Sequence, residues 1–447
     1  MRRVGQYARF TFDRAEFHTA SGRVELDYSF AGEPGRQVRF REQLAFDGVA
    51  SPADPRLVDR ALRAVHIIGG VSYYKADCPP HFDLGPHRLG SDEAAFYDRL
   101  YRSGLQEFLH VNRQQVAEQD LASFLDGVPC RASVPEAPGH PTDRVGRVLL
   151  PFGGGRESVL TAQLLRDRGL DVTLFRLRGH PRITETAQWL GLPLAVCERQ
   201  LSANLLQMNR VGALNGHVPV TAFVLAVSLL YAVAHGFDSI CMSNERDADE
   251  PTVAGTAINH QWSKSSEFEQ AFRGFARDTL GAGTRLFNPA RVAGSLAVSH
   301  LLARRYPDAL GVVTSCNANW RLSGPAERRW CCRCAKCAST YLSLAPFFAA
   351  DALQQTFEGA PLHDPEMLPL FRALLGHTPE RPFECVAAPR EAATAMRLLL
   401  GRPEYRDAPA LVEYARLEGA RAPESSDGDA FWERQAAMLE HEIDALA

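Results

Sequence analysis

The chain has 447 residues, which is too long for one small core and predicts two or three domains. Hydrophobic residues make up 45% and charged residues 23%, proportions that are ordinary for a soluble globular protein. The net charge of −4 offers no basic face, so we expect no nucleic-acid partner. The N-terminus lacks the continuous apolar stretch of a signal peptide, and we therefore expect a cytoplasmic protein.

The first region, residues 1–132, has short segments of alternating polar and apolar residues, followed by helical patterns at 55–68 and 92–110. These patterns predict an N-terminal α+β domain. Within it, an apolar run leads into a glycine pair, two tyrosines and a lysine, in the sequence HIIGGVSYYKA. Two interpretations stay open: a strand or helix that ends in a turn, or a loop that faces the substrate through Tyr74 and Lys75.

The next region begins after a linker. Residues 133–144 contain three prolines and a glycine, a composition typical of a domain boundary. Strands then alternate with helices over residues 145–350, which predicts an α/β fold with a doubly wound parallel sheet and helices on both faces. The expected strands are 147–151, 171–177 and 194–198, and the expected helices are 158–168 and 183–190. Residues 351–447 predict a C-terminal helical region.

The longest apolar run covers residues 218–234 and reaches only the low edge of a membrane-spanning length. A threonine, a serine and a tyrosine interrupt this run, and strand-like segments flank it on both sides. We therefore expect a buried helix of the α/β domain, and no membrane partner.

An apolar strand pattern ends in three glycines and continues as a helix, in the sequence VLLPFGGGRESVL. Without Cβ atoms, the loop lets backbone N–H groups approach an anion, and the helix start adds free N–H donors and its positive dipole end. The alternative is a flexible turn with ordinary helix capping. The residues expected to hold a phosphate or pyrophosphate are Gly153, Gly154, Gly155, Arg156 and Ser158, with Glu157 facing a Mg²⁺ ion.

This loop has the spacing of neither a Walker loop nor the dinucleotide-binding fingerprint. It resembles the SGGxDS signature of the PP-loop ATP pyrophosphatases, which cut ATP between its α and β phosphates. Gly153 stands where that signature has serine, and Glu157 stands where it has aspartate. Because glutamate is one methylene longer than aspartate, we expect the metal or pyrophosphate to be bound in a slightly different geometry.

Polar residues also follow the strand expected at 239–242, in the sequence SNERD. In a doubly wound sheet this strand end and the glycine loop would open on the same crevice. Asn244 and Glu245 are therefore expected to meet the nucleotide or its metal. A solvated loop is the alternative.

The segment NHQWSKSSEFE, residues 259–269, leads into a helical pattern. Ser266 followed by Glu269 predicts a helix N-cap with its capping-box partner. Capping does not account for the polar residues that precede it. The residues able to provide general acid/base and carboxylate-binding groups are His260, Gln261, Trp262 and Lys264.

Half of the ten cysteines lie between Cys316 and Cys337. This clustering indicates a metal site in a reducing compartment. The spacing suits zinc, which we favour over an iron–sulfur cluster, and Cys332 is the expected non-ligand. The expected ligands are Cys316, Cys331, Cys334 and Cys337. Reduced, unliganded cysteines at a helix start are the alternative.

Four segments, taken in order, resemble the MurL-type UDP-N-acetylmuramoyl-L-alanyl-L-glutamate epimerases. They are GGGRES, SNERDADEP, NHQWSKSSEFEQAF and WCCRCAKC. The likeness extends to HIIGGVSYYKA and GLQEF and spans most of residues 1–348. It implies a PP-loop domain behind a family-specific N-terminal domain. NHQWSKSSEFE is the most specific segment, because generic ATP pyrophosphatases have no reason to share it. Arg156 and Glu157 depart from the expected GGGKDS form of the loop.

The resemblance implies a role in peptidoglycan biosynthesis: ATP-dependent epimerisation of a terminal L-glutamate through an acyl-adenylate, with release of AMP and pyrophosphate. It implies a small nucleotide-sugar peptide as substrate, Mg²⁺ with the ATP, and a structural Zn²⁺. The residues implied in catalysis are His260, Lys264 and Glu267, with His260 or Lys264 as the proton-transfer group. The residues implied in substrate binding are Tyr74, Lys75, Asn259, Gln261 and Ser263.

Two other functions stay open. The cysteine pattern also resembles the zinc site of the QueC-type PP-loop ligases, which adenylate a carboxylate and couple it to ammonia. That alternative leaves the N-terminal domain and NHQWSKSSEFE unexplained. The residues at Gly153, Arg156 and Glu157 would also suit a degenerate nucleotide-binding protein without catalysis.

Overall fold

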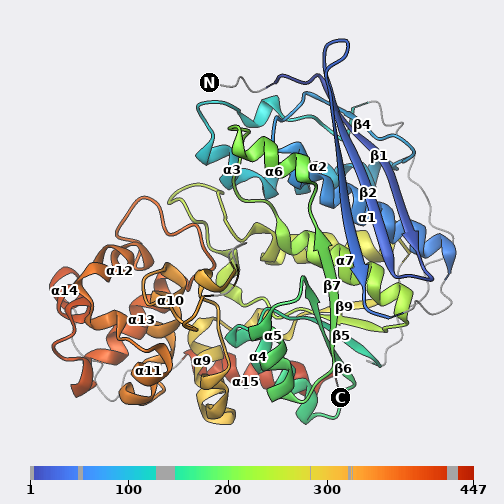
Figure 1. Ribbon diagram of the computed structural model, residues 1–447. Coiled ribbons are helices and arrows are strands. Elements are labelled where there is room, and N and C mark those ends of the chain that lie inside the picture. Colours follow the sequence, from blue (N-terminus) through green and yellow to red (C-terminus); the bar gives the residue numbers. More distant parts are fainter. Residues whose placement is uncertain are drawn as a thin grey trace.

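The computed structural model describes residues 5–48, 54–126, 146–281, 283–320, 324, 326–419 and 431–446. Over these residues the chain has a mixed α/β fold, with one nine-stranded sheet and helices on both of its faces (Figure 1). The expected α/β class is thus confirmed. The expected linker at 133–144 lies outside the described residues.

The sheet joins an N-terminal part, antiparallel except for the parallel pair of β1 and β4, to a parallel part, in the order β4-β1-β2-β3-β7-β6-β5-β8-β9. β1, β2 and β3 pair antiparallel, and β3 continues antiparallel onto β7. The pairs among β7, β6, β5, β8 and β9 are all parallel. The N-terminal strands therefore extend the same sheet as the parallel strands. The bounds are β1 (Arg9–His18), β2 (Arg23–Ala31), β3 (Gln37–Phe46), β4 (His81–Asp83), β5 (Val148–Pro151), β6 (Val172–Leu177), β7 (Leu194–Gln200), β8 (Ser239–Cys241) and β9 (Arg285–Phe287).

Side chains of β5 alternate between two hydrophobic cores, as expected for a strand buried on both faces. Leu149 belongs to one core, while Val148 and Leu150 belong to the other. The first core includes residues of α1 (Pro55–Tyr74) and α7 (Val220–His235). The second core includes residues of α4 (Arg156–Asp167), α5 (Pro181–Leu190) and α9 (Ser295–Arg305).

Helix α1 is longer than expected, because the glycine pair lies inside it and not in a turn after it. A Cβ on Gly69 would lie 2.8 Å from the ring of Phe223, and a Cβ on Gly70 would lie 2.5 Å from the ring of Phe12. The two glycines thus let α1 pack closely against α7 and β1. Of the two interpretations left open, the helix that ends in a turn is confirmed, because α1 ends at Tyr74 and a turn follows at 75–77. The glycines lie inside the helix and provide close packing.

Helix α7 forms from the longest apolar run, as expected. It packs against α1 and β5, and most of its residues are buried. Among the residues that the structure describes, no helix is long and apolar enough to cross a membrane. The apolar character of α7 is thus explained by its place in the protein core.

The remaining helices include the C-terminal group, most of which gathers at one side of the molecule (orange in Figure 1), while its last helix packs against α9. This group is α10 (Ala335–Leu344), α11 (Ala350–Phe357), α12 (Leu368–Leu374), α13 (Pro389–Leu400), α14 (Pro409–Glu418) and α15 (Phe431–Asp444). The helix expected at 92–110 is divided at Leu105 into α2 (Ser91–Gly104) and α3 (Gln106–Val111). The two helices whose bounds have not yet been given are α6 (Ala203–Arg210) and α8 (Ser266–Gly274).

Candidate active site

A cavity of about 420 Å³ opens at the carboxyl ends of β5 and β8. From β5 the chain continues to β6 and β7 on one side, and it returns to β8 on the other side of β5. Ligands of open α/β sheets bind where the strand order reverses in this way. The residues singled out in the sequence that line this cavity are Gly153, Gly155, Arg156, Glu157, Ser158, Asn244, Glu245, Gln261 and Lys264.

The glycine loop connects β5 to α4. Gly154 has a left-handed backbone with φ of +72°, and a Cβ there would lie 2.7 Å from Ile183 Cδ1. Its carbonyl accepts a hydrogen bond of 2.9 Å from the Thr314 N–H, although Gly154 itself is not among the lining residues. No side chain caps α4 at Gly155, so the first N–H groups of this helix remain suited to an anion in the cavity.

Arg156 is buried, and its guanidinium is directed toward α9. Nη1 donates to Ser299 Oγ at 2.5 Å and to the Ser295 carbonyl at 3.4 Å. Nη2 lies 3.5 Å from Glu157 Oε1. Arg156 therefore connects the start of α4 to α9. Arg156 also lines the cavity, and its expected contact with phosphate stays a prediction.

Two carboxylates reach the cavity from the two loops, Glu157 after β5 and Glu245 after β8. Glu245 Oε1 accepts a hydrogen bond of 2.8 Å from Ser295 Oγ, whereas its buried Oε2 has no hydrogen-bond partner among the described residues. Burial and the neighbouring Glu157 raise the pKa of Glu245 well above its usual value. A divalent cation would satisfy the free oxygen and offset the repulsion between the carboxylates. These two residues could hold Mg²⁺.

A cysteine and several cations form a second group of lining residues. Lys264 Nζ donates to Cys385 Sγ at 3.3 Å, and Lys336 of α10 lines the same cavity. Burial raises the pKa of Cys385, but Lys264, Lys336 and His260 outweigh burial and hold it well below its usual value. Because these cations stabilise the thiolate form, Cys385 is expected to be ionised at neutral pH.

His260 connects this thiolate to the N-terminal region. Its Nδ1 hydrogen-bonds Glu107 of α3, and its ring centroid lies 4.2 Å from that of His217. Burial lowers the pKa of His260, but hydrogen bonds to Cys385 and Glu107 raise it to about 9. Burial, with His260 and Lys264 nearby, lowers the pKa of His217 to about 3. Possible ligand atoms of Glu107, His217 and His260 lie within 4.8 Å of one another. The hydrogen bond between His260 Nδ1 and Glu107 joins these side chains to the Cys385 group.

Four residues of this group were not assigned to the site by the sequence. Glu107 lies in the GLQEF segment, and Lys336 lies within the cysteine run, so both were near recognised motifs. Cys385 and His217 carry no motif of their own. The contact of Cys385 with Lys264 joins positions 121 residues apart, and only the folded chain brings them together.

Tyr74 and Lys75 do not line the cavity. Tyr74 is fully buried, and its hydroxyl accepts a hydrogen bond of 2.8 Å from the Ala122 N–H. Lys75 Nζ donates to Asn215 Oδ1 at 2.7 Å, and burial lowers the pKa of Lys75 to about 8. The structure therefore places both residues at the end of α1, in the packing of the N-terminal region, and not in a loop facing this cavity.

Within the NHQWSKSSEFE segment, Gln261 and Lys264 alone line the cavity, and the other expected site residues lie away from the lining: Asn259, His260, Trp262, Ser263 and Glu267. Asn259 Nδ2 donates to the Ala248 carbonyl at 2.8 Å and so holds the loop together. Ser263 is buried. Glu267 is exposed and forms an ion pair of 2.7 Å with Arg99. The catalytic role expected for Glu267 stays a prediction.

The N-cap of α8 is Ser265 and not the expected Ser266. Ser265 Oγ accepts a hydrogen bond of 3.2 Å from the Phe268 N–H. Glu269 was expected as the capping-box partner, but it is buried and accepts hydrogen bonds from Arg291. The expected cap was therefore wrong by one residue, and Glu269 has another role.

Arg291 is the partner of Glu269 and also fixes two cavity-lining segments. Its guanidinium donates to Glu269 Oε2 at 3.0 Å and 3.1 Å. It also donates to the Lys264 carbonyl at 2.6 Å and to the Glu245 carbonyl at 3.1 Å. Arg291 thus holds the backbones that carry one carboxylate and one ammonium group of the cavity.

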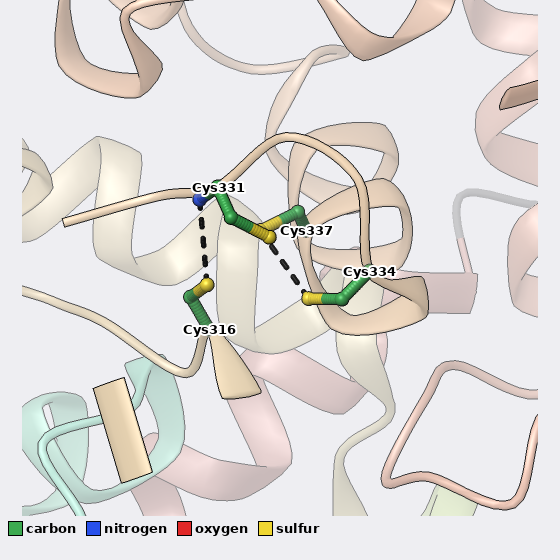
Figure 2. Close-up of side chains that lie close together, drawn as sticks. All are labelled: Cys316, Cys331, Cys334 and Cys337. Atoms are coloured by element: carbon green, nitrogen blue, oxygen red, sulfur yellow. Dashed lines mark hydrogen bonds between the residues drawn. The ribbon is translucent and has the colours of Figure 1, made fainter. Parts of the chain in front are cut away.

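The four expected metal ligands converge at the start of α10 (Figure 2). Their sulfur atoms lie within 4.8 Å of one another, with Cys331 and Cys337 at 3.8 Å and Cys334 and Cys337 at 3.5 Å. A tetrahedral zinc site with Zn–S bonds of about 2.3 Å places its sulfurs about 3.8 Å apart, so the cluster fits zinc. Cys332 lies outside the cluster, because its Sγ donates to the Phe357 carbonyl.

Known protein-family models match the sequence over most of its length. Residues 1–288 match the MurL N-terminal domain, and residues 312–428 match the MurL C-terminal domain. The chain belongs to the MurL family. The family resemblance inferred from the motifs is therefore confirmed.

Relatives within the MurL family carry the name UDP-N-acetyl-alpha-D-muramoyl-L-alanyl-L-glutamate epimerase. The relative from Salinispora tropica is 36% identical over 407 residues, which are 90% of this chain and 86% of that protein. The relative from a Micromonospora species is 34% identical over 94% of this chain and 93% of its own length. The relative from Xanthomonas oryzae pv. oryzae is 34% identical over 92% of this chain and 90% of its own length.

Proposed function

We propose that this chain is an epimerase that uses ATP to invert the terminal L-glutamate of UDP-N-acetylmuramoyl-L-alanyl-L-glutamate, in the cytoplasm, during peptidoglycan biosynthesis. The observation that carries the proposal is the activity named for three relatives, which are 34–36% identical to this chain. AMP and pyrophosphate are the expected by-products.

The chemistry explains why ATP would be needed. An α-proton beside a carboxylate is too weakly acidic to remove, because the carbanion would add charge to charge. Transfer of AMP to the carboxylate removes this charge and makes the carbonyl an electron sink. The glycine loop and the uncapped start of α4 support a phosphate site of the PP-loop type in a doubly wound sheet.

Metal ions have two proposed places. Glu157 and Glu245 would hold Mg²⁺, which neutralises phosphate charge during adenylation. The four-cysteine cluster would hold a structural Zn²⁺. Lys336 lies between Cys334 and Cys337 in the sequence and lines the cavity, so ordering of this turn would position the Lys336 ammonium group.

The test is incubation of the purified protein with ATP, Mg²⁺ and UDP-N-acetylmuramoyl-L-alanyl-L-glutamate in D₂O. Pyrophosphate and AMP are quantified, and the hydrolysed glutamate is resolved by chiral chromatography with mass spectrometry. We expect AMP, pyrophosphate and α-deuterated D-glutamate. α,β-Methylene-ATP, which cannot be cut between its α and β phosphates, serves as the matched control and should give no product.

Other outcomes would separate the alternatives. Pyrophosphate release with unlabelled L-glutamate would exclude inversion, and amide formation on adding ammonia would indicate the ligase. ATP binding without pyrophosphate release would indicate a degenerate nucleotide-binding protein. Inversion at the same rate without ATP would contradict the acyl-adenylate.

A further inference from the structure

Cys385 differs from the other cysteines in its surroundings. It lines the cavity and is only partly buried, and it is not one of the four clustered cysteines. Cys78 and Cys197 lie in the hydrophobic core, where burial raises the pKa of each thiol. A thiol that faces a cavity lined by the glycine loop is placed to meet a ligand there, whereas the core thiols are not.

The charged groups around Cys385 come from separate parts of the chain. Lys264 Nζ lies 3.3 Å from its sulfur, and Lys336 and His260 act on it as further cations. The acidic neighbour is Glu384, whose carboxylate accepts a hydrogen bond of 3.1 Å from the Lys336 N–H. The cations outnumber this carboxylate, so the site stabilises negative charge on sulfur.

We propose that the Cys385 thiolate is the base that removes the α-proton of the activated glutamyl residue, an inference that rests on the proposed epimerase function. The sulfur takes the proton, the C–H electron pair forms a Cα=C bond, and the carbonyl π pair moves onto oxygen. Water then protonates the opposite face of Cα as the carbonyl reforms. The Cys385 thiol returns its proton to the resulting hydroxide, which restores the thiolate.

The cations that stabilise the thiolate also serve the enolate. Lys264 and Lys336 line the same cavity and provide ammonium groups for the negative charge that develops on the carbonyl oxygen. His260 is a positioning residue in this scheme, because it hydrogen-bonds Cys385 and is itself held by Glu107. This arrangement gives the N-terminal region, through α3, a direct part in orienting the base.

The test is a single-turnover reaction of Cys385→Ser in D₂O, with enzyme in excess over substrate. Pyrophosphate release should stay within a few-fold of the wild-type rate, whereas α-deuteration of glutamate should fall at least about 100-fold, because serine is a far weaker base. Cys332→Ser is the matched control, since a serine hydroxyl can also donate to the Phe357 carbonyl, and it should keep both rates.

Two outcomes would overturn the proposal. If the Cys385→Ser variant deuterates the α-carbon at the wild-type rate, another group must be the base. If the Cys385→Ser variant loses pyrophosphate release together with deuteration, Cys385 is needed for adenylation or for folding and is not the base alone. Failure of the proposed function is distinguishable, because wild-type protein would then release no pyrophosphate with this substrate.

Alkylation of the wild-type protein provides a measurement that needs no variant. Iodoacetamide at pH 6 with peptide mapping should label Cys385 ahead of Cys78 and Cys197, and ATP with the glutamyl substrate should slow this labelling at least about tenfold by covering the cavity. Labelling of Cys385 only above about pH 8, or at equal rates with and without ligands, would overturn the proposal.

Discussion

The cavity has two groups of charged residues with opposite character. Glu157 and Glu245 form the acidic group. Lys264 and Lys336 form the basic group around the Cys385 thiolate, on which His260 acts from outside the cavity lining. In the acidic group Glu245 Oε2 has no hydrogen-bond partner among the described residues, whereas in the basic group the protein itself supplies the cations. This difference separates a site suited to metal-bound phosphates from a site suited to an anionic base.

The four-cysteine cluster supports the basic group, so its removal should have the largest effect. In Cys337→Ser, the loss of one thiolate should abolish stoichiometric zinc and lower the melting temperature by more than any other change considered, because metal binding contributes directly to folding free energy. Mass spectrometry measures the zinc content, and calorimetry measures the melting temperature. Cys332→Ser should retain zinc, and a metal-free variant of unchanged stability would contradict the structural role.

Arg291 holds both groups, so Arg291→Ala should disturb both at once. Its loss removes one of the partners of buried Glu269, which keeps Arg273 and Asn288, and should lower the free energy of unfolding by about 2 kcal/mol. Urea unfolding measures the loss. Pyrophosphate release and α-deuteration should fall together, because the Glu245 and Lys264 backbones both lose an anchor. A fall in only one rate would show that the groups are held independently.

Glu245→Gln should affect the acidic group alone. The neutral amide binds Mg²⁺ weakly, so pyrophosphate release should fall about 100-fold and the Mg²⁺ requirement should rise. A magnesium titration of the initial rate measures both. Glu250→Gln, at an exposed position in the same loop, should behave as wild type. An unchanged Mg²⁺ requirement in Glu245→Gln would exclude this carboxylate as a ligand.

Glu391 of α13 is buried near Asp247 and should make stability depend on pH. Its Oε2 accepts a hydrogen bond of 2.9 Å from the Leu296 N–H, and burial with Asp247 nearby raises its pKa from 4.5 to about 7. The folded state thus binds this proton more tightly than the unfolded state, so its contribution is present below pH 4.5 and is lost as pH rises through 7.

Glu391→Gln should remove this dependence. The variant should be more stable than wild type by about 2 kcal/mol at pH 8 and should lose this advantage near pH 5. Urea unfolding at the two pH values measures the difference. An equal difference at both values would mean that Glu391 does not titrate between them.

The acidic group was predictable from sequence because its residues directly follow strands. Glycines and carboxylates after β5 and β8 could be placed at one sheet edge from the strand pattern alone. The basic group was only partly predictable. His260 and Lys264 lie in a dense polar segment, but Cys385 and Glu107 reach it through contacts between distant parts of the chain.

The glycine pair in α1 shows the same limit for the fold. The helical pattern was expected to end at residue 68, before Gly69 and Gly70, because glycine commonly marks a helix end or a turn. Their actual role depends on the rings of Phe223 and Phe12, which local sequence does not reveal. Patterns within a segment thus predicted strands, the glycine loop and the cysteine cluster, whereas close packing between segments required the structure.

The most direct test of the division between the two groups is the ratio of α-deuterium incorporated to pyrophosphate released in a single turnover in D₂O. Glu245→Gln should lower both quantities and leave the ratio near the wild-type value. Cys385→Ser should lower the ratio at least about 100-fold. Equal ratios in the two variants would contradict separate sites for adenylation and proton transfer.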